Sequence, residues 1–364
     1  MWRLKTGEKS VRKYFIDNIR ILCIFLLFPF HTAMIFNNFG ESFYIHGQNS
    51  TLASLFVIGV YPWWMSVLFT LAGISTVYAL KQRTAKQYVK ERFFKLFIPL
   101  LSAIIFLIPV QTYLADKFFR NYEGSYLEHL PIYFSITDLN GYDGHFTPAH
   151  TWFMLYLFII SVLTLPLMIW YKNRKNKLSG SRINMIKLVL MFLIIIICTP
   201  ILEIGGKSLG EFAAYFLLGY FVLSMEEVQD RLVRYRIPLA CTWVMLIIMR
   251  CVLYQMHISE GLGWDLQQRV LGWIGVLAIL ALGKKHLEFN NSFTKYFTPA
   301  AFPIYFFHQT IVVIAGYFIV RYIQGTLIQY VGIVGISFGL TLLTYEIFRR
   351  FVITRFLFGI KKIN

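Results

Sequence analysis

The chain has 364 residues, of which 57% are hydrophobic, 18% aromatic and 15% charged. This composition excludes an ordinary soluble globular domain, which would expose too much apolar surface to water. The formal net charge of +17 invites a nucleic-acid-binding interpretation, so the placement of the basic residues has to decide between that interpretation and a membrane protein.

Apolar segments long enough to cross a membrane recur along the whole chain. About 30 Å of hydrocarbon requires roughly 20 helical residues. In chain order we predict ten transmembrane helices, at residues 15–36, 53–80, 94–114, 152–171, 186–202, 211–224, 238–254, 266–283, 302–320 and 327–348. The first is not a cleavable signal sequence, because it is long, contains charged residues and lacks a small-residue cleavage site.

The basic residues fall on alternate sides of these helices. Most lie in the N-terminal segment, in the even-numbered loops and in the C-terminal tail, whereas the odd-numbered loops carry Lys117, Arg120, Lys207 and Arg321. This positive-inside pattern predicts that both termini are cytoplasmic. It also assigns the basic charge to lipid and membrane insertion, so no nucleic-acid partner is expected.

The sequence shows no linker, low-complexity tract or internal repeat. We therefore predict one all-α, polytopic membrane domain over residues 1–364, with a helical core at 10–350. The long outer loop at 115–151 is a candidate for shaping a binding site, because loops of this length are often functional. The cysteines all lie in apolar segments, which predicts packing rather than disulfides, and no metal site is expected: Cys23, Cys198, Cys241 and Cys251.

The first predicted helix contains three ionisable residues, which are costly in hydrocarbon and mark a candidate site. Arg20 and His31 are eleven residues apart, which is three helical turns plus about 20°, so both project from one face about 16 Å apart. Asp17 lies three residues before Arg20 on nearly the same stripe. The alternative is that Asp17 and Arg20 anchor the helix at the interface, and that His31 is a buried histidine bonded to a neighbouring helix.

Two further positions are candidates. Arg92 and Lys95 share a helical face at the cytoplasmic surface, where they suit the phosphate oxygens of an anionic ligand. Ordinary positive-inside charge explains them equally well. His308 lies within the ninth predicted helix and is as compatible with a structural role as with a catalytic one.

Several segments resemble the membrane-bound acyltransferase 3 family, closest to its glucan biosynthesis protein C branch. They are YFIDNIR followed by His31, which fits that family's Arg-x10-His signature, LFTLAGIS, KERFFKLFIPLL, AHTWFMLYL and IYFFH ending at His308. The segments occur in the family's order. Lys95 departs from the second arginine of the family's Arg-x-x-Arg segment, so the charge is kept but the planar fork is lost.

The resemblance implies an O-acyltransferase of the bacterial plasma membrane that moves an acetyl or succinyl group from cytoplasmic acyl-CoA to an envelope carbohydrate or glycolipid. Arg20, Arg92 and Lys95 are expected to hold the acyl-CoA phosphates. His31 is expected to be the general base, since an unperturbed imidazole titrates near pH 6.5. Asp17 is expected to aim Arg20, and His308 to orient the donor or assist proton transfer. A homo-oligomer is also compatible with the sequence.

Two other functions remain open from sequence. A proton-coupled transporter or flippase of an anionic or glycan substrate would use the same buried charges, although the inverted repeats of many transporters are not visible. A membrane scaffold without activity would leave the ionisable stripe of the first helix unexplained. Consumption of a thioester separates the first alternative from an acyltransferase.

Overall fold

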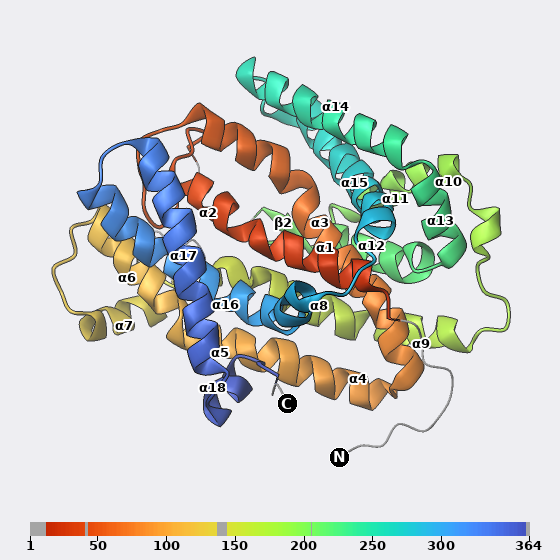
Figure 1. The fold of residues 1–364 in the computed structure, drawn as a ribbon, viewed down its shortest axis with the longest axis horizontal. Coiled ribbons are helices and arrows are strands. Elements are labelled where there is room, and N and C mark those ends of the chain that lie inside the picture. The colour runs from red at the N-terminus through yellow and green to blue at the C-terminus, as the bar shows by residue number, and fades with distance from the viewer. Residues whose placement is uncertain (1–11, 41–42, 137–143, 205, 362–364) are drawn as a thin grey trace.

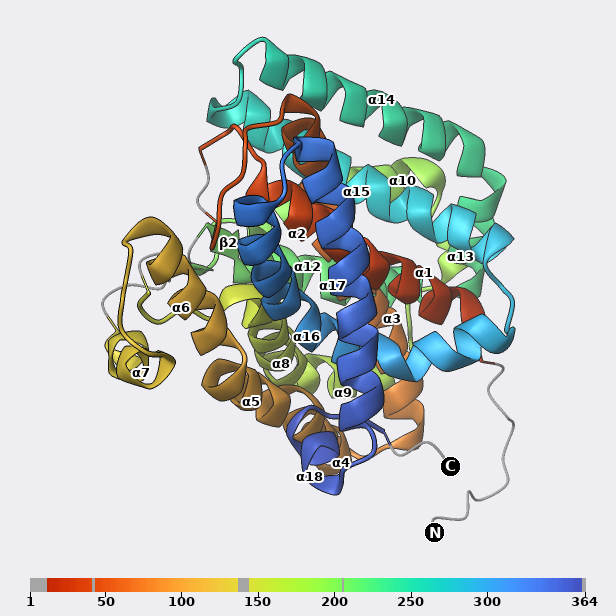
Figure 2. The same ribbon diagram turned by 60° about the vertical axis from the view of Figure 1, so that its left-hand side comes forward.

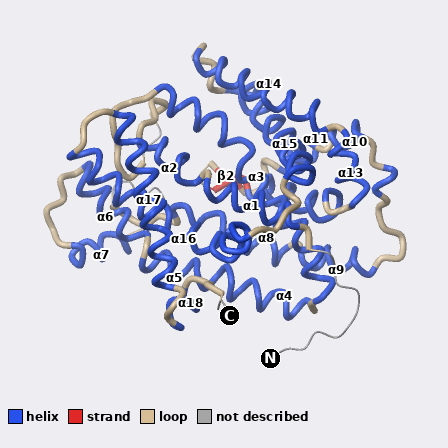
Figure 3. The backbone as a smooth tube through the Cα atoms, viewed as in Figure 1, coloured by secondary structure: helices blue, strands red, loops and turns tan. Residues whose placement is uncertain are grey.

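The computed structural model describes residues 12–40, 43–136, 144–204 and 206–361. These residues are almost entirely helical, and the one sheet within them is a two-residue antiparallel pair, β1 Glu203–Ile204 and β2 Lys207–Ser208 (Figure 3). The predicted all-α class is confirmed.

The helices of the first half are α1 Tyr14–Phe25, α2 Leu27–Ile35, α3 Thr51–Gln82, α4 Ala85–Arg92, α5 Ile98–Phe106, α6 Ile108–Phe119, α7 Tyr126–Phe134, α8 Trp152–Leu163 and α9 Leu165–Asn173. Those of the second half are α10 Met185–Leu190, α11 Phe192–Cys198, α12 Leu209–Leu218, α13 Glu226–Arg234, α14 Arg236–Gln255, α15 Gly261–His286, α16 Ser292–Tyr322, α17 Thr326–Phe348 and α18 Val352–Leu357. Short 3-10 turns occur at Ala149–Thr151 and Gly180–Arg182, and π-helical turns at Phe93–Phe97 and Gly219–Leu223.

All ten predicted segments coincide with helical parts of the described chain, and a polytopic membrane protein is confirmed. Seven helical segments are long and apolar enough to cross a membrane, and two bent helix pairs bring the number to nine if each pair is one crossing. The segment Met185–Cys198 is apolar but shorter. Ten crossings therefore stays a prediction.

Proline accounts for two of the three places where the structure departs from the predicted helix boundaries. The predicted helix at 186–202 ends at Cys198: Thr199 keeps helical backbone angles, but Pro200 has no N–H with which to continue the helical hydrogen bonds. The predicted helix at 152–171 bends by 43° between α8 and α9, where Pro166 stands in the first turn of α9. After Leu223 the chain turns by 97° into the amphipathic α13, which the sequence analysis treated as loop.

The helix pair α1–α2 lies in the interior of the bundle, packed against α3, α15 and α16, whereas α14 runs along one edge (Figures 1 and 2). Burial separates the same groups: 78% of the apolar window of α16 is buried, against 17% in α14 and 22% in α17. We infer that α14 and α17 present most of their surface to lipid, while α1, α2 and α16 build the interior.

Two glycines allow α3 and α12 to pack backbone against backbone. A Cβ atom at Gly73 would lie 2.0 Å from the carbonyl oxygen of Phe216, and one at Gly219 would lie 2.4 Å from that of Thr70. Small residues permit this close approach between membrane helices. The pairing holds α3, which forms one wall of the candidate site, against the rest of the bundle.

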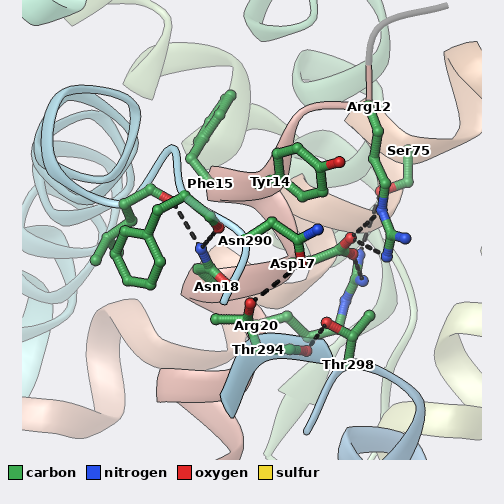
Figure 4. Close-up of polar contacts among 12 residues, drawn as sticks. Arg12, Tyr14, Phe15, Asp17, Asn18, Arg20, Ser75, Asn290, Thr294 and Thr298 are labelled. Atoms are coloured by element: carbon green, nitrogen blue, oxygen red, sulfur yellow. Dashed lines mark hydrogen bonds and ion pairs between the residues drawn. The ribbon is translucent and has the colours of Figure 1, made fainter. Parts of the chain in front are cut away.

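The start of α1 is fixed by the connection between α15 and α16. The backbone N–H groups of Tyr14 and Phe15 donate to the Glu288 carboxylate, at 2.8 and 3.3 Å. The Asn18 amide donates to the carbonyls of Leu287 and Phe289, at 2.7 and 2.8 Å (Figure 4). Since the first N–H groups of a helix have no partner within it, these contacts stabilise its end and set its position.

Within the predicted outer loop, residues 137–143 lie outside the described residues, and α7 packs against the end of α6. His129 of α7 is fully buried, and its Nε2 atom lies 3.6 Å from Oδ2 of Asp116. Burial, and to a smaller extent His145, lowers the pKa of His129 to about 4. Burial thus outweighs the nearby carboxylate, and the ring is neutral at pH 7.

The two ends of the described chain lie at the same end of the bundle (Figures 1 and 2). Burial, together with the positive charges of Lys95 and Arg12, lowers the pKa of Lys361, which places this residue near both. A chain that crosses a membrane an even number of times has both ends on the same side, which agrees with this arrangement. That this end faces the cytoplasm stays a prediction.

Candidate active site

A basic cavity of about 450 Å³ opens at the end of the bundle where the described chain begins and ends. Residues of α1, α3, α4 and the following π-helical turn form its walls. Its charged lining residues are Arg12, Lys13, Asp17, Arg20, Arg83, Glu91, Arg92 and Lys95. Basic residues outnumber acidic ones, so the cavity favours an anionic ligand.

Local sequence explains how α4 brings Arg92 and Lys95 to this cavity. A capping box between Thr84 and Gln87 starts α4. Pro99 lacks the N–H that would bond the Lys95 carbonyl, and the chain forms the π-helical turn Phe93–Phe97, in which the Ile98 N–H bonds the Phe93 carbonyl. Arg92 is the last residue of α4 and Lys95 lies within the π-helical turn, and both line the cavity.

Asp17 stands between two arginines at the mouth of the cavity (Figure 4). Its carboxylate accepts from Arg12 at 2.6 Å and from Arg20 at 3.0 Å, and Arg20 also donates to the Ser75 hydroxyl at 3.2 Å. The Asp17–Arg20 pair that the spacing predicted is present, and its role in aiming Arg20 stays a prediction. The structure places this carboxylate in the basic cavity with Arg20.

Arg92 and Lys95 differ in how firmly they are engaged. Arg92 donates to the Thr76 hydroxyl at 3.2 Å and lies over the Tyr88 ring, 4.8 Å from its centroid. Lys95 pairs with Glu91, which also pairs with Arg83 at 2.5 Å. The Arg92 guanidinium is thus pre-oriented by neutral groups, whereas Lys95 already has a carboxylate partner that a bound phosphate would have to replace.

Three histidines from three different elements lie close together inside the bundle: His31 of α2, His308 of α16 and His150 of the turn before α8. The ring centroids of His31 and His308 are 5.1 Å apart, and those of His308 and His150 are 5.2 Å apart. His308 and His150 are buried, while the His31 ring is partly exposed and stacks on Phe43 at 5.9 Å. We call His31, His150 and His308 the histidine cluster.

The surroundings fix the neutral tautomers of two of these histidines. The Nδ1 atom of His308 lies 2.6 Å from the Tyr305 carbonyl, and Nε2 of His150 lies 3.0 Å from the Phe306 carbonyl. A carbonyl only accepts, so each of these nitrogens carries the hydrogen and the opposite nitrogen carries the lone pair. Those lone-pair atoms, Nε2 of His308 and Nδ1 of His150, are buried without a partner.

His31 is not tied to a neighbouring helix in this way. Its Nδ1 atom is buried without a partner, and no hydrogen bond to its ring occurs within the described residues. The alternative that His31 is a histidine held by another helix is therefore not what the structure shows. The ring is free to exchange protons with a bound group or with its neighbours in the cluster.

His150 is the residue of this cluster that the sequence analysis missed as a site residue. It lies in the turn Ala149–Thr151 before α8, at the end of the predicted outer loop 115–151. Within the described residues no cluster of His, Cys, Asp and Glu suits a metal ion. The available signal was its position in AHTWFMLYL, one of the segments that carried the family resemblance.

A second polar contact adjoins His308. The Gln309 amide donates to the Gln111 carbonyl oxygen at 3.0 Å, and the Gln111 amide donates to the Thr310 hydroxyl at 2.7 Å. All three side chains are buried. This network joins α6 to α16 and keeps the turn of α16 that carries His308 in one orientation.

A comparison with known families decides what kind of protein carries this cavity and cluster. The profile of the family described as "Acyltransferase domain" matches residues 13–346, which include the histidine cluster and every lining residue of the cavity except Arg12. The chain belongs to this family. It is also similar to the proteins called "Glucans biosynthesis protein C" of Salmonella paratyphi B and Salmonella enteritidis, with 25% identity over 96% of this chain and 94% of theirs. No solved structure matches the chain.

In this acyltransferase, all six residues that the sequence put forward fall in two places. Asp17, Arg20, Arg92 and Lys95 line the basic cavity, and His31 and His308 stand side by side in the histidine cluster. The helix pair α1–α2 contributes to both places.

Proposed function

We propose that this acyltransferase transfers an acyl group, acetyl or succinyl, from cytoplasmic acyl-CoA to a hydroxyl of an envelope glucan or related carbohydrate. The observation that carries the proposal is that α1–α2 lines an anion-binding cavity at one level and, three turns further on, contributes His31 to a cluster of histidines that each have one unpartnered ring nitrogen. The name of the similar Salmonella proteins, "Glucans biosynthesis protein C", supports glucan as the acceptor class. The plasma membrane of a bacterium is the location that this donor and acceptor require.

The cavity suits the polyphosphate end of acyl-CoA. Arg92 and Arg20 are oriented by Thr76, Ser75 and Asp17, so their guanidinium groups can bind phosphate oxygens with little further ordering. The pantetheine arm would run along α1 towards His31. Ile24 and Leu27, which lie on the helix between the two places, are buried and have to move aside for it.

His31 is the general base in this proposal. In one tautomer of His31, the Nδ1 atom carries the hydrogen and donates it to the lone pair on Nε2 of His308. The Nε2 atom of His31 then has the lone pair that takes the proton of the acceptor hydroxyl. The hydroxyl oxygen then attacks the thioester carbonyl, the C–S bond breaks, and the released thiolate takes the proton back from His31. His308 assists by sharing the positive charge while His31 holds the extra proton.

The test uses the purified protein in lipid nanodiscs, offered acetyl-CoA or succinyl-CoA together with a glucan oligosaccharide. We expect release of free CoA thiol and acylation of the glucan, and a decrease of at least about 100-fold in His31→Ala, since general-base catalysis contributes about 10²- to 10⁴-fold. His46→Gln, at an exposed outer-loop histidine, is the matched control.

Full activity in a correctly inserted His31→Ala protein would remove His31 from the mechanism. Absence of thiol release with either donor would contradict acyl-CoA dependence and favour the transporter alternative, which consumes no thioester.

A further inference from the structure

The His150 ring packs against His308, which in turn packs against the proposed base His31. We infer that His150 is a positioning residue of the transfer reaction, which holds His308 in the tautomer and orientation that leave the His308 Nε2 lone pair facing the cluster. The inference rests on the proposed function, because it gives His150 its role through the proton that His31 removes.

The first support is the packing of the two rings. The His150 ring meets the His308 ring edge-on, with centroids 5.2 Å apart and an interplanar angle of 80°. His150 is 5% exposed and His308 fully buried, so neither ring can turn without displacing the other. The His31 ring also packs against the His308 ring, with centroids 5.1 Å apart and an interplanar angle of 38°.

The second support is a reciprocal connection between the turn that carries His150 and the turn of α16 that precedes His308. His150 Nε2–H donates to the Phe306 carbonyl at 3.0 Å, and the Tyr305 hydroxyl donates to the His150 carbonyl. The Tyr305 carbonyl is in turn the acceptor that fixes Nδ1–H of His308. Residues 305 and 306 thus hold both histidines, and His150 fastens that segment to α8.

The third support is the backbone that presents His150. Ala149 has φ of +45°, in the left-handed region that non-glycine residues rarely adopt. The Thr151 hydroxyl donates to the Pro148 carbonyl at 2.6 Å, which closes the turn. Such strain persists only where the surrounding structure enforces it, and it occurs at functional sites more often than elsewhere.

The fourth support is chemical. The carbonyl partners leave lone pairs on His308 Nε2 and His150 Nδ1, and both atoms are buried without a partner. Two neutral rings that both present lone pairs cannot bond each other. Each can therefore receive a hydrogen from a third group, and the His31 ring, with its unpartnered Nδ1, packs against His308 with centroids 5.1 Å apart.

The test compares His150→Phe, which keeps a ring but removes both nitrogens, with His150→Gln, whose amide N–H can still donate to the Phe306 carbonyl. We expect kcat to fall roughly 10- to 100-fold in His150→Phe, with partial recovery in His150→Gln, because misplaced supporting groups cost about this much in other sites. The Kd of acyl-CoA, which depends on the distant cavity, is expected to be unchanged in both.

A spectroscopic readout tests the tautomer itself. In protein labelled with ¹⁵N at histidine, the His308 signals, assigned by their loss in His308→Phe, are expected to show the Nδ1–H tautomer in the wild type. In His150→Phe they are expected to move towards a mixture of tautomers. Unchanged kcat and unchanged His308 signals in His150→Phe would overturn the inference, as would a loss of acyl-CoA binding in parallel with kcat.

The two proposals fail in different ways. If the wild-type protein released no thiol from any acyl-CoA, the proposed function would be wrong. The ¹⁵N spectra would still decide whether His150 holds His308.

Discussion

At the scale of single residues, the basic cavity combines cations that are free to bind an anion with cations that already have a carboxylate. Glu91 pairs with both Lys95 and Arg83, so it competes with any phosphate for two of the positive charges. Arg92 is held by neutral Thr76 and Tyr88, and it interacts with the Glu91 charge more weakly than Lys95 and Arg83 do. Removal of the Glu91 charge is therefore expected to strengthen acyl-CoA binding, and removal of the Arg92 charge is expected to weaken it.

We expect Glu91→Gln to bind acyl-CoA more tightly, by up to about five-fold, because it frees Lys95 and Arg83 from a partly exposed ion pair. Arg92→Ala is expected to bind it roughly 10- to 100-fold more weakly, since a hydrogen bond to a charged group contributes about 1.5 to 3 kcal/mol. Isothermal titration calorimetry in nanodiscs measures both, and the gain in Glu91→Gln should shrink in high salt.

Glu123→Gln removes the same charge from an exposed position in the outer loop and is the matched control. If it tightened binding as much as Glu91→Gln, the effect would come from net charge and not from the cavity.

At the scale of secondary-structure elements, the site depends on helices that are interrupted or closely packed. The first membrane segment runs through α1 and α2 as one span with only a local irregularity at Leu26, whereas α4 passes into a π-helical turn that contains Lys95. In contrast, α3 runs unbroken from Thr51 to Gln82 and carries Ser75 and Thr76 to the cavity. Its position against α12 rests on the glycine contact described above.

We expect Gly73→Ala to lower the free energy of unfolding by about 1 to 3 kcal/mol, because its Cβ would collide with the Phe216 backbone and push α3 from α12. Thermal unfolding in detergent should show a lower Tm, together with weaker acyl-CoA binding. Gly335→Ala in α17 has open space around its Cβ and serves as the control, with an unchanged Tm expected. Equal Tm values for the two variants would contradict the close packing of α3 and α12.

At the scale of the whole molecule, the basic cavity and both ends of the described chain lie at one end of the bundle. The connection between α2 and α3 and the helix α7 lie away from that end (Figures 1 and 2). The positive-inside pattern assigns the first end to the cytoplasm. This orientation would give the cavity access to acyl-CoA.

Cysteine labelling in intact cells tests the orientation. In a variant without Cys23, Cys198, Cys241 and Cys251, we expect His46→Cys to react with a membrane-impermeant maleimide, and Lys175→Cys to react only after the cells are permeabilised. Both positions are exposed, so access to water is not what distinguishes them. The reverse labelling pattern would invert the topology and contradict a cytoplasmic acyl donor.

The sequence by itself determined the features that depend on local composition. Apolar segments of membrane length gave the all-α polytopic class, and the spacing of Asp17, Arg20 and His31 along one helix located residues of both the cavity and the cluster. Arg92 and Lys95 were found from charge at a helix entrance, and His308 from its place inside an apolar segment. These signals are readable because each lies within one helix.

Only the tertiary structure decided which of these residues meet. His150 stands at the end of a long loop, and its contact with His308 joins residues more than 150 positions apart, which no periodicity reports. The contact of Arg92 with Thr76 and the approach of α3 to α12 likewise follow from packing between elements. Helical periodicity specifies the faces of a helix, whereas the contact between two faces is fixed by the fold as a whole.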